Sequence, residues 1–154
     1  MTPAARFQAA IEILDQVVAA ARDNGPAADT LIARYFRDRR YAGSKDRRAV
    51  RDLAYAAIRR AGERPESGRA ALLGVVADQP ELAALFDGSP HGPMPIAEEP
   101  VGGAGLAPAW LMERLAHLDG AEQAALLDRA PLDLRVNRLK AGRDGVIGEL
   151  PGAV

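Results

Sequence analysis

Residues 34–60 read RYFRDRRYAGSKDRRAVRDLAYAAIRR, a stretch that combines apolar residues at helical spacing with a dense run of arginines. Between Arg34 and Arg64 there are eleven Arg and Lys residues but only four Asp and Glu residues, whereas the whole chain of 154 residues has a formal net charge of −1. The positive charge is therefore concentrated in one segment. Such segregation is typical of a surface that binds a polyanion.

Around this stretch, the spacing of apolar residues predicts a bundle of five short amphipathic helices between the start of the chain and residue 86. Thr2, Ser44 and Ser67 are expected to be the N-caps of the first, third and fourth helices, and Asn24-Gly25-Pro26 is expected to end the first. The apolar positions that define the five helices are Phe7, Ile11, Leu14, Val18 and Ala21; Ala28, Leu31, Ile32, Tyr35 and Phe36; Val50, Leu53, Ala54, Ala57 and Ile58; Leu72, Leu73 and Val76; and Leu82, Leu85 and Phe86.

The third of these helices, expected from Ser44 to about Ala61, has two distinct faces. One face carries the apolar residues given above. The other is predicted to present a row of cations and one tyrosine to solvent: Arg47, Arg48, Arg51, Tyr55 and Arg59.

The rest of the chain is more irregular in composition. Residues 87–108 contain five Gly and five Pro, which disfavours a continuous helix or a central strand. Helices are then expected from Pro108 and over 121–129, followed by a half-buried strand at 131–137, where apolar and polar residues alternate, and a short helix at 145–150. Because one strand is not a stable unit, we expect the carboxyl end to be the beginning of a second domain that continues beyond this chain.

The expected fold is therefore all-α, with the start of a small α/β segment at its end. Four parts are predicted: a helical bundle at 1–86, a Gly/Pro-rich connector at 87–107, a helical segment at 108–130, and the first strand and helix of a truncated α/β subdomain at 131–154.

Composition excludes several classes of site. The chain has no cysteine, which rules out disulfides, thiolate zinc sites and cysteine nucleophiles. No apolar run approaches the roughly 20 residues of a membrane span, so we expect a soluble cytoplasmic protein without a membrane partner. We expect no metal, cofactor-binding or catalytic residue in this chain.

The residues that come closest to a catalytic or ligand site have simpler explanations. Gly103 and Gly105 lack the third glycine of a dinucleotide fingerprint and the preceding strand. His91 and His117 are isolated, and the adjacent Glu98 and Glu99 lie in the connector, where they would not hold the geometry that acid–base catalysis requires.

The arginine-rich segment is the candidate binding site, and a nucleic acid is the candidate polyanion. Lys and Arg side chains bind phosphates and release counterions, which makes affinity fall steeply with salt. Tyr41 and Tyr55 lie among the arginines, and each is either a residue that stacks on unpaired bases or a part of the core and its rim. The predicted RNA-binding residues are Arg37, Arg39, Arg40, Lys45, Arg47, Arg48 and Arg51.

Three motifs carry a resemblance to a known family. They are a D-R-x-x-V-x-D-L-x-Y pattern (Asp46, Arg47, Val50, Asp52, Leu53, Tyr55), a P-x-W-L helix start (Pro108, Trp110, Leu111) and a P-L-D-L-R-V-N-x-L-K run at 131–140. Together they resemble the amino-terminal part of the RsmB (Sun/Fmu) group of bacterial ribosomal-RNA cytosine-C5 methyltransferases.

The resemblance implies a NusB-like helical RNA-binding domain, then a small α/β segment, then a domain that binds S-adenosylmethionine. It also implies that the cofactor motifs and the two active-site cysteines lie beyond Val154. The chain as given is then expected to be inactive by itself and to position ribosomal RNA for the missing catalytic domain.

Two alternatives remain at this point. A NusB-like transcription-antitermination or protein-interaction module is one, although its free-standing members end with the helical domain. The other is a structural bundle whose arginines pack against the absent catalytic domain.

Overall fold

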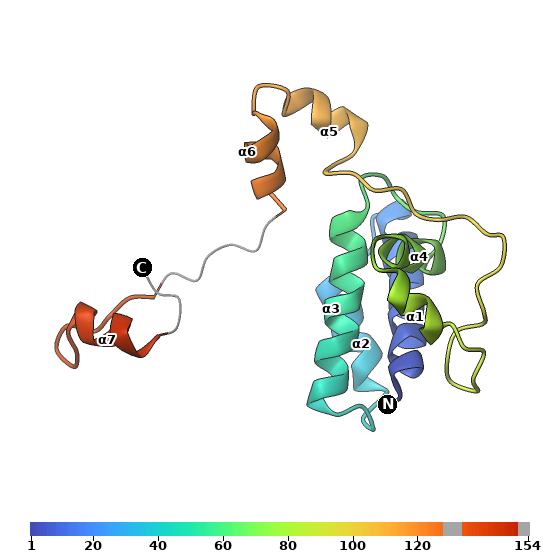
Figure 1. The fold of residues 1–154 in the computed structure, drawn as a ribbon, viewed down its shortest axis with the longest axis horizontal. Helices are drawn as coiled ribbons and strands as arrows, with labels where there is room; N and C mark the ends of the chain where they lie inside the picture. Colours follow the sequence, from blue (N-terminus) through green and yellow to red (C-terminus); the bar gives the residue numbers. More distant parts are fainter. Residues whose placement is uncertain (128–133, 151–154) are drawn as a thin grey trace.

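The structure is a computed structural model, and it describes residues 1–127 and 134–150. Within these ranges the chain forms α-helices and one 3-10 helix, η1 (Figure 1). Their bounds are α1 Pro3–Arg22, α2 Ala28–Arg37, α3 Ser44–Arg60, α4 Gly68–Asp78, η1 Pro80–Leu85, α5 Ala109–Arg114, α6 Gly120–Ala125 and α7 Arg143–Glu149.

The prediction of a mainly helical fold is confirmed. The prediction of a strand at 131–137 is not supported where it can be compared, because residues 134–137 have irregular backbone, while residues 131–133 lie outside the described part. The physical reason is that a strand needs a neighbouring strand to satisfy its backbone donors and acceptors, and the described residues provide none there.

The helix ends agree closely with the expected caps. The Thr2 hydroxyl accepts a hydrogen bond from the Ala5 amide at 3.1 Å, and the Ser67 hydroxyl accepts one from the Ala70 amide at 3.0 Å. Asn24 adopts the left-handed conformation (φ 52°) just after α1. In contrast, the N-cap of α3 is Gly43 and not Ser44, because the Asp46 carboxylate reaches back to the Gly43 amide.

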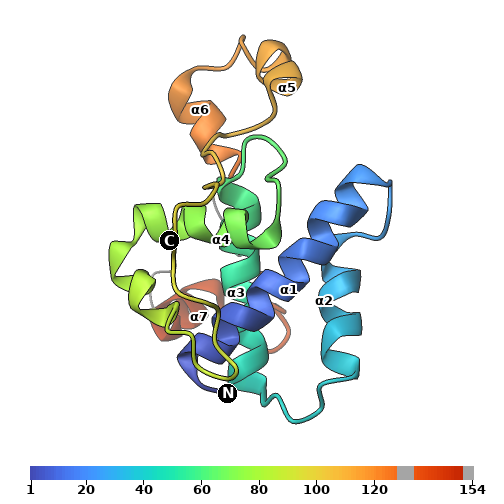
Figure 2. The ribbon, with the colours of Figure 1, turned by 90° about the vertical axis from the view of Figure 1, so that its right-hand side faces the viewer.

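Helix α1 is the centre of the bundle, since α2, α3 and α4 all pack against it. Figure 2 shows α2 on one side of α1, and α3 behind α1. Of the expected stripe, Phe7, Ile11 and Leu14 are buried, whereas Val18 is half-buried and Ala21 is exposed. Ile13 is completely buried as well because α1 is covered on more than one side. Full burial of such a side chain contributes roughly 1.5–3 kcal/mol.

The connector is irregular, as predicted, but it is fastened to the bundle along much of its length. The Gly102 amide donates to the carbonyl of Ala70 at 2.8 Å, and Ala104 forms an isolated antiparallel bridge with Ala61. Gly62 and Gly105 approach so closely that a Cβ on Gly62 would lie 2.7 Å from the Gly105 Cα. These contacts require glycine because backbone meets backbone.

Two arginines clamp the connector to the bundle. Arg60 at the end of α3 binds the carboxylate of Asp78 at 2.8 Å and the carbonyl of Gly102. Arg69 on α4 makes two hydrogen bonds to Glu99, at 2.6 and 2.7 Å, while its guanidinium group lies 4.9 Å from the ring centre of Phe86. The connector therefore covers one side of α4 in place of a further helix.

We expect the Glu99 clamp to make stability depend on pH. Hydrogen bonds from Arg69 hold the pKa of Glu99 below its ordinary value, so the clamp stabilises the fold above the unfolded pKa and is lost as pH falls through the folded one. Glu99→Gln should lower the free energy of unfolding by about 1 kcal/mol at neutral pH, and this difference should shrink as pH falls through the folded pKa of Glu99.

Urea unfolding of both proteins at several pH values checks this expectation. Glu98→Gln is the matched control, because Glu98 is exposed and has no hydrogen-bond or ion-pair partner in the described part of the chain. A Glu99→Gln difference that stays constant from neutral to acid pH would show that the ion pair contributes nothing.

The first two helices beyond residue 108 are shorter than expected, while α7 begins two residues before the expected helix at 145–150 and ends one residue before its end. α5 begins after Pro108, as predicted, but ends at Arg114, so Leu115 and Leu118 lie beyond it. α6 ends at Ala125, and residues 128 and 129 of the expected helix lie outside the described residues. Helices of this length are marginal without a packing partner, and Trp110 is 61% exposed.

Candidate nucleic-acid interface

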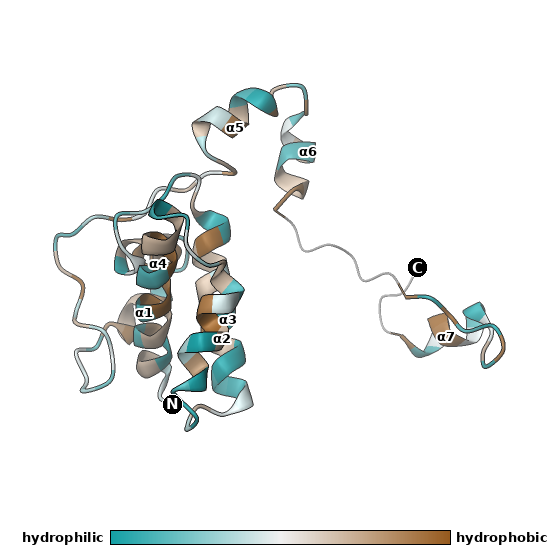
Figure 3. Ribbon diagram, turned by 180° about the vertical axis from the view of Figure 1, so that it is seen from behind, coloured by the Kyte–Doolittle hydropathy of each residue, from teal (hydrophilic) through white to brown (hydrophobic). Residues whose placement is uncertain are grey.

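The arginine-rich segment forms one end of the bundle. The end of α2, the turn at 38–43 and the start of α3 meet there, beside the N-terminus (Figure 1). Hydrophilic residues gather at this end (Figure 3). The turn is held because the small side chain of Ala42 is buried, while Tyr41 next to it is 74% exposed.

Five of the seven predicted RNA-binding residues project into solvent. None of their side chains forms an ion pair or hydrogen bond with another described residue, and we call these five the cationic surface: Arg37, Arg40, Lys45, Arg48 and Arg51. Within residues 34–60 the exposed carboxylates are Asp38 and Asp52, so positive charge prevails. Free guanidinium groups of this kind suit bidentate contacts to phosphate.

Arg39 has a structural role. Its guanidinium group lies 3.6 Å from the ring centre of Tyr35 and donates to the Glu12 carboxylate at 3.1 Å. The hydroxyl of Tyr35 donates to the same carboxylate at 2.7 Å, and burial together with this bond raises the pKa of Tyr35. Arg39 therefore links α1 to the turn after α2, and its charge is paired with that of Glu12.

Arg47 was expected to be exposed like Arg48 and Arg51, but it is half-buried while they are exposed. At 100° per residue it falls next to the buried arc of α3, which is centred on Val50, Ala54 and Ala57. Its Nε donates to the carbonyl of Ala42 at 2.8 Å. Arg47 thereby fixes the turn that presents the cationic surface.

Asp46 is the acidic residue that sits inside this cationic end. Its carboxylate accepts hydrogen bonds from the chain's amino group at 3.2 Å, from Arg6 at 2.9 Å and from the Gly43 amide at 3.3 Å. The bonds from the amino group and from Arg6 hold the pKa of Asp46 below its ordinary value. Because these partners within the chain neutralise the charge of the Asp46 carboxylate, it weakens the positive potential of the exposed cations only slightly.

Two exposed cations near this surface were not among the predicted site residues. Arg34 is one helical turn before Arg37 on α2, a three-residue spacing that places both on one face. Arg59 shares the solvent face of α3 with Arg48, but it lies about 21 Å along the helix from Lys45. The charge therefore extends along α3 but is densest at the α2–α3 turn.

Other classes of site find no support in the described ranges, 1–127 and 134–150. No group of three or more His, Asp or Glu residues suitable for a metal ion occurs there. None of the helices in those ranges combines the length and the hydropathy that a membrane-spanning helix needs.

In comparisons with models of protein families, with curated proteins and with solved structures, nothing matches this chain. The fold and the site thus define a class only: a small helical bundle with a cationic end.

Proposed function

We propose that this chain is the RNA-binding amino-terminal module of an S-adenosylmethionine-dependent ribosomal-RNA cytosine-C5 methyltransferase. In this proposal the NusB-like bundle holds ribosomal RNA through the cationic surface, and a catalytic domain outside this chain transfers the methyl group. The observation that carries the RNA-binding part is the group of five exposed cations without partners among the described residues. The methyltransferase part rests on the motif resemblance.

The proposed mechanism is electrostatic. Each phosphate that an Arg or Lys side chain neutralises releases condensed counterions, and this favours binding regardless of sequence. The cations of the surface come from two helices and a turn whose geometry is fixed by Arg39 and Arg47. A surface that is organised before binding loses less conformational entropy when RNA docks.

Salt titration of binding to a ribosomal-RNA fragment tests the proposal. With about five phosphates neutralised, the logarithm of the association constant should fall with the logarithm of salt concentration with a slope of roughly −3 to −5. Fluorescence anisotropy with a labelled RNA measures the association constant at each salt concentration. A slope near zero, or no binding at low salt, would contradict the proposal.

One observation favours a second candidate, a NusB-like antitermination or protein-interaction module. Helices α1 to α4 and η1 share a single core that α5, α6 and α7 do not join, as expected of a helical module that works alone. A pull-down after nuclease treatment that enriches transcription or ribosomal proteins, together with no RNA affinity of the purified chain, would favour this candidate. If addition of the missing catalytic domain shields the arginines of the cationic surface from solvent, a purely structural role would be favoured instead.

A further inference from the structure

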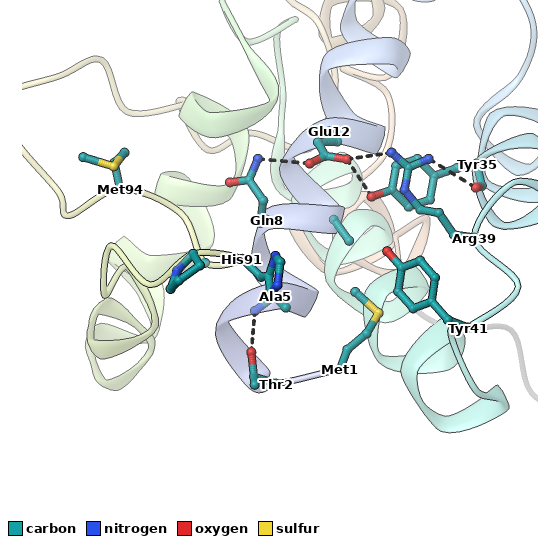
Figure 4. A pocket seen from close by; sticks show the side chains of 13 residues that line it. Met1, Thr2, Ala5, Gln8, Glu12, Tyr35, Arg39, Tyr41, His91 and Met94 are labelled. Carbon is teal, nitrogen blue, oxygen red and sulfur yellow. Dashed lines mark hydrogen bonds and ion pairs between the residues drawn. The ribbon is translucent and has the colours of Figure 1, made fainter.

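An open groove of about 1110 Å³ lies next to the cationic surface. One wall comes from the N-terminal half of α1, the second from the end of α2 and its turn, and the third from residues 90–94 of the connector. Figure 4 shows Tyr41 and Arg39 on one side of the groove and His91 and Met94 on the other. The groove is large enough for an organic ligand of the size of a nucleotide.

Tyr41 gives the groove a stacking surface. Its side chain is 74% exposed, and its ring stacks on no other aromatic ring in the part of the chain that the structure describes. Arg40 and Lys45, two members of the cationic surface, flank Tyr41 in the sequence. An RNA held by these cations would come close to Tyr41, and an unpaired base can stack on such an aromatic ring.

The α1 wall presents hydrogen-bond acceptors. The Glu12 Oε2 atom already accepts from Tyr35 and Arg39, whereas Oε1 accepts a single bond, from Gln8 at 3.2 Å. Each carboxylate oxygen accepts up to two bonds, so Oε1 keeps one free position. Gln8 donates through its amide nitrogen in that contact, which leaves its amide oxygen as a second acceptor.

Among the four RNA bases, guanine alone carries two adjacent donor groups, N1–H and N2–H₂, on one edge. A carboxylate with a neighbouring amide oxygen complements that edge, and the other bases would place an acceptor against it. The groove therefore has both a stacking surface and an edge-reading wall.

We infer that this groove binds one unpaired guanine of the RNA that the cationic surface holds, with the base stacked on Tyr41 and its donor edge on Glu12 and Gln8. The inference rests on the proposed RNA-binding function. It adds sequence selectivity, which phosphate contacts alone do not supply.

Hairpin RNAs with one variable loop nucleotide test the inference, with a fully paired duplex as the reference. Tyr41→Ala should weaken binding of the guanine-loop hairpin by about 5- to 150-fold and leave duplex binding unchanged. Tyr41→Phe, which keeps the ring, should bind within about twofold of the unaltered protein. Trp110→Ala is the matched control, since Trp110 is an exposed aromatic residue outside the groove.

The edge contact is tested with the unaltered protein first. Replacing the loop guanine by adenine, cytosine or uracil should each lower affinity by about 5- to 150-fold. Glu12→Gln should reduce this preference, provided that circular dichroism shows the variant is folded.

The outcomes separate the inference from the function on which it rests. Salt-dependent RNA binding with no effect of Tyr41→Ala and equal affinity for the four loop bases overturns the groove and leaves the cationic surface in place. If Tyr41→Ala weakens hairpin binding but the unaltered protein binds the four loop bases equally well, the guanine assignment is overturned. No RNA binding by the unaltered protein overturns both proposals.

Discussion

Gly68→Ala should cost the fold about 3 kcal/mol or more, enough to lower the melting temperature by on the order of 15 °C. Gly68 begins α4 where this helix crosses α1, and its amide donates to the Asp15 carboxylate at 2.6 Å. A Cβ on Gly68 would collide with the carbonyl of Ile11 and the amide of Asp15, and it would lie 2.8 Å from the carbonyl carbon of Leu14. All three are backbone atoms of a helix, so they cannot rotate away as a side chain would.

Thermal unfolding followed by circular dichroism measures the effect. Gly103→Ala is the control, because a Cβ at Gly103 meets no atom within 4 Å. That variant should stay within about 0.5 kcal/mol of the unaltered protein. Equal melting temperatures of the Gly68→Ala and Gly103→Ala variants would contradict the close crossing of α1 and α4.

The second large effect is expected on RNA binding. Changing Lys45, Arg48 and Arg51 to Glu removes three cations from the solvent face of α3 and adds three anions. The slope of affinity against salt should become shallower by about three, and affinity at low salt should fall by at least about 100-fold. The fold should persist because these side chains are exposed, and an acidic residue at position 45 is favourable near the N-terminus of a helix.

A second triple variant with the same change in net charge controls for the general effect of charge. It changes Arg135, Arg138 and Lys140 to Glu, which are exposed and lie outside the cationic surface. Anisotropy titrations of both variants at several salt concentrations give the comparison. An equal loss in the two variants would mean that net charge, and not this surface, determines binding.

Arg47 is left unchanged in this design for a structural reason. It is half-buried and bonded to the Ala42 carbonyl, so its replacement would disturb the turn together with the charge. A loss of binding in an Arg47 variant would therefore not distinguish a lost phosphate contact from a displaced turn.

Local signals in the sequence were sufficient for most of the helical bundle. Thr2 and Ser67 cap α1 and α4 as predicted, because an N-cap bond joins residues only three positions apart. The apolar spacing of Phe7, Ile11 and Leu14 likewise identified a buried face, since the helical repeat alone places these side chains together. The concentration of positive charge between residues 34 and 64 was also plain from the sequence.

The use of each charge was decided by tertiary structure. Arg39, Arg47 and Arg48 look alike in the sequence, but they have different roles in the structure. Arg39 is restrained by an ion pair with Glu12, which lies 27 residues away along the chain. Arg60 and Arg69 likewise fasten the connector through partners brought close only when the chain folds.

The sequence by itself determined, to within two residues, where helices begin, and also which faces are apolar and where cations concentrate, because those properties depend on residues within a few positions of one another. Only the tertiary structure decided which cations remain free for a ligand and that a groove lies beside them. Those properties depend on contacts between segments that are far apart along the chain, such as α1, the turn at 38–43 and residues 90–94.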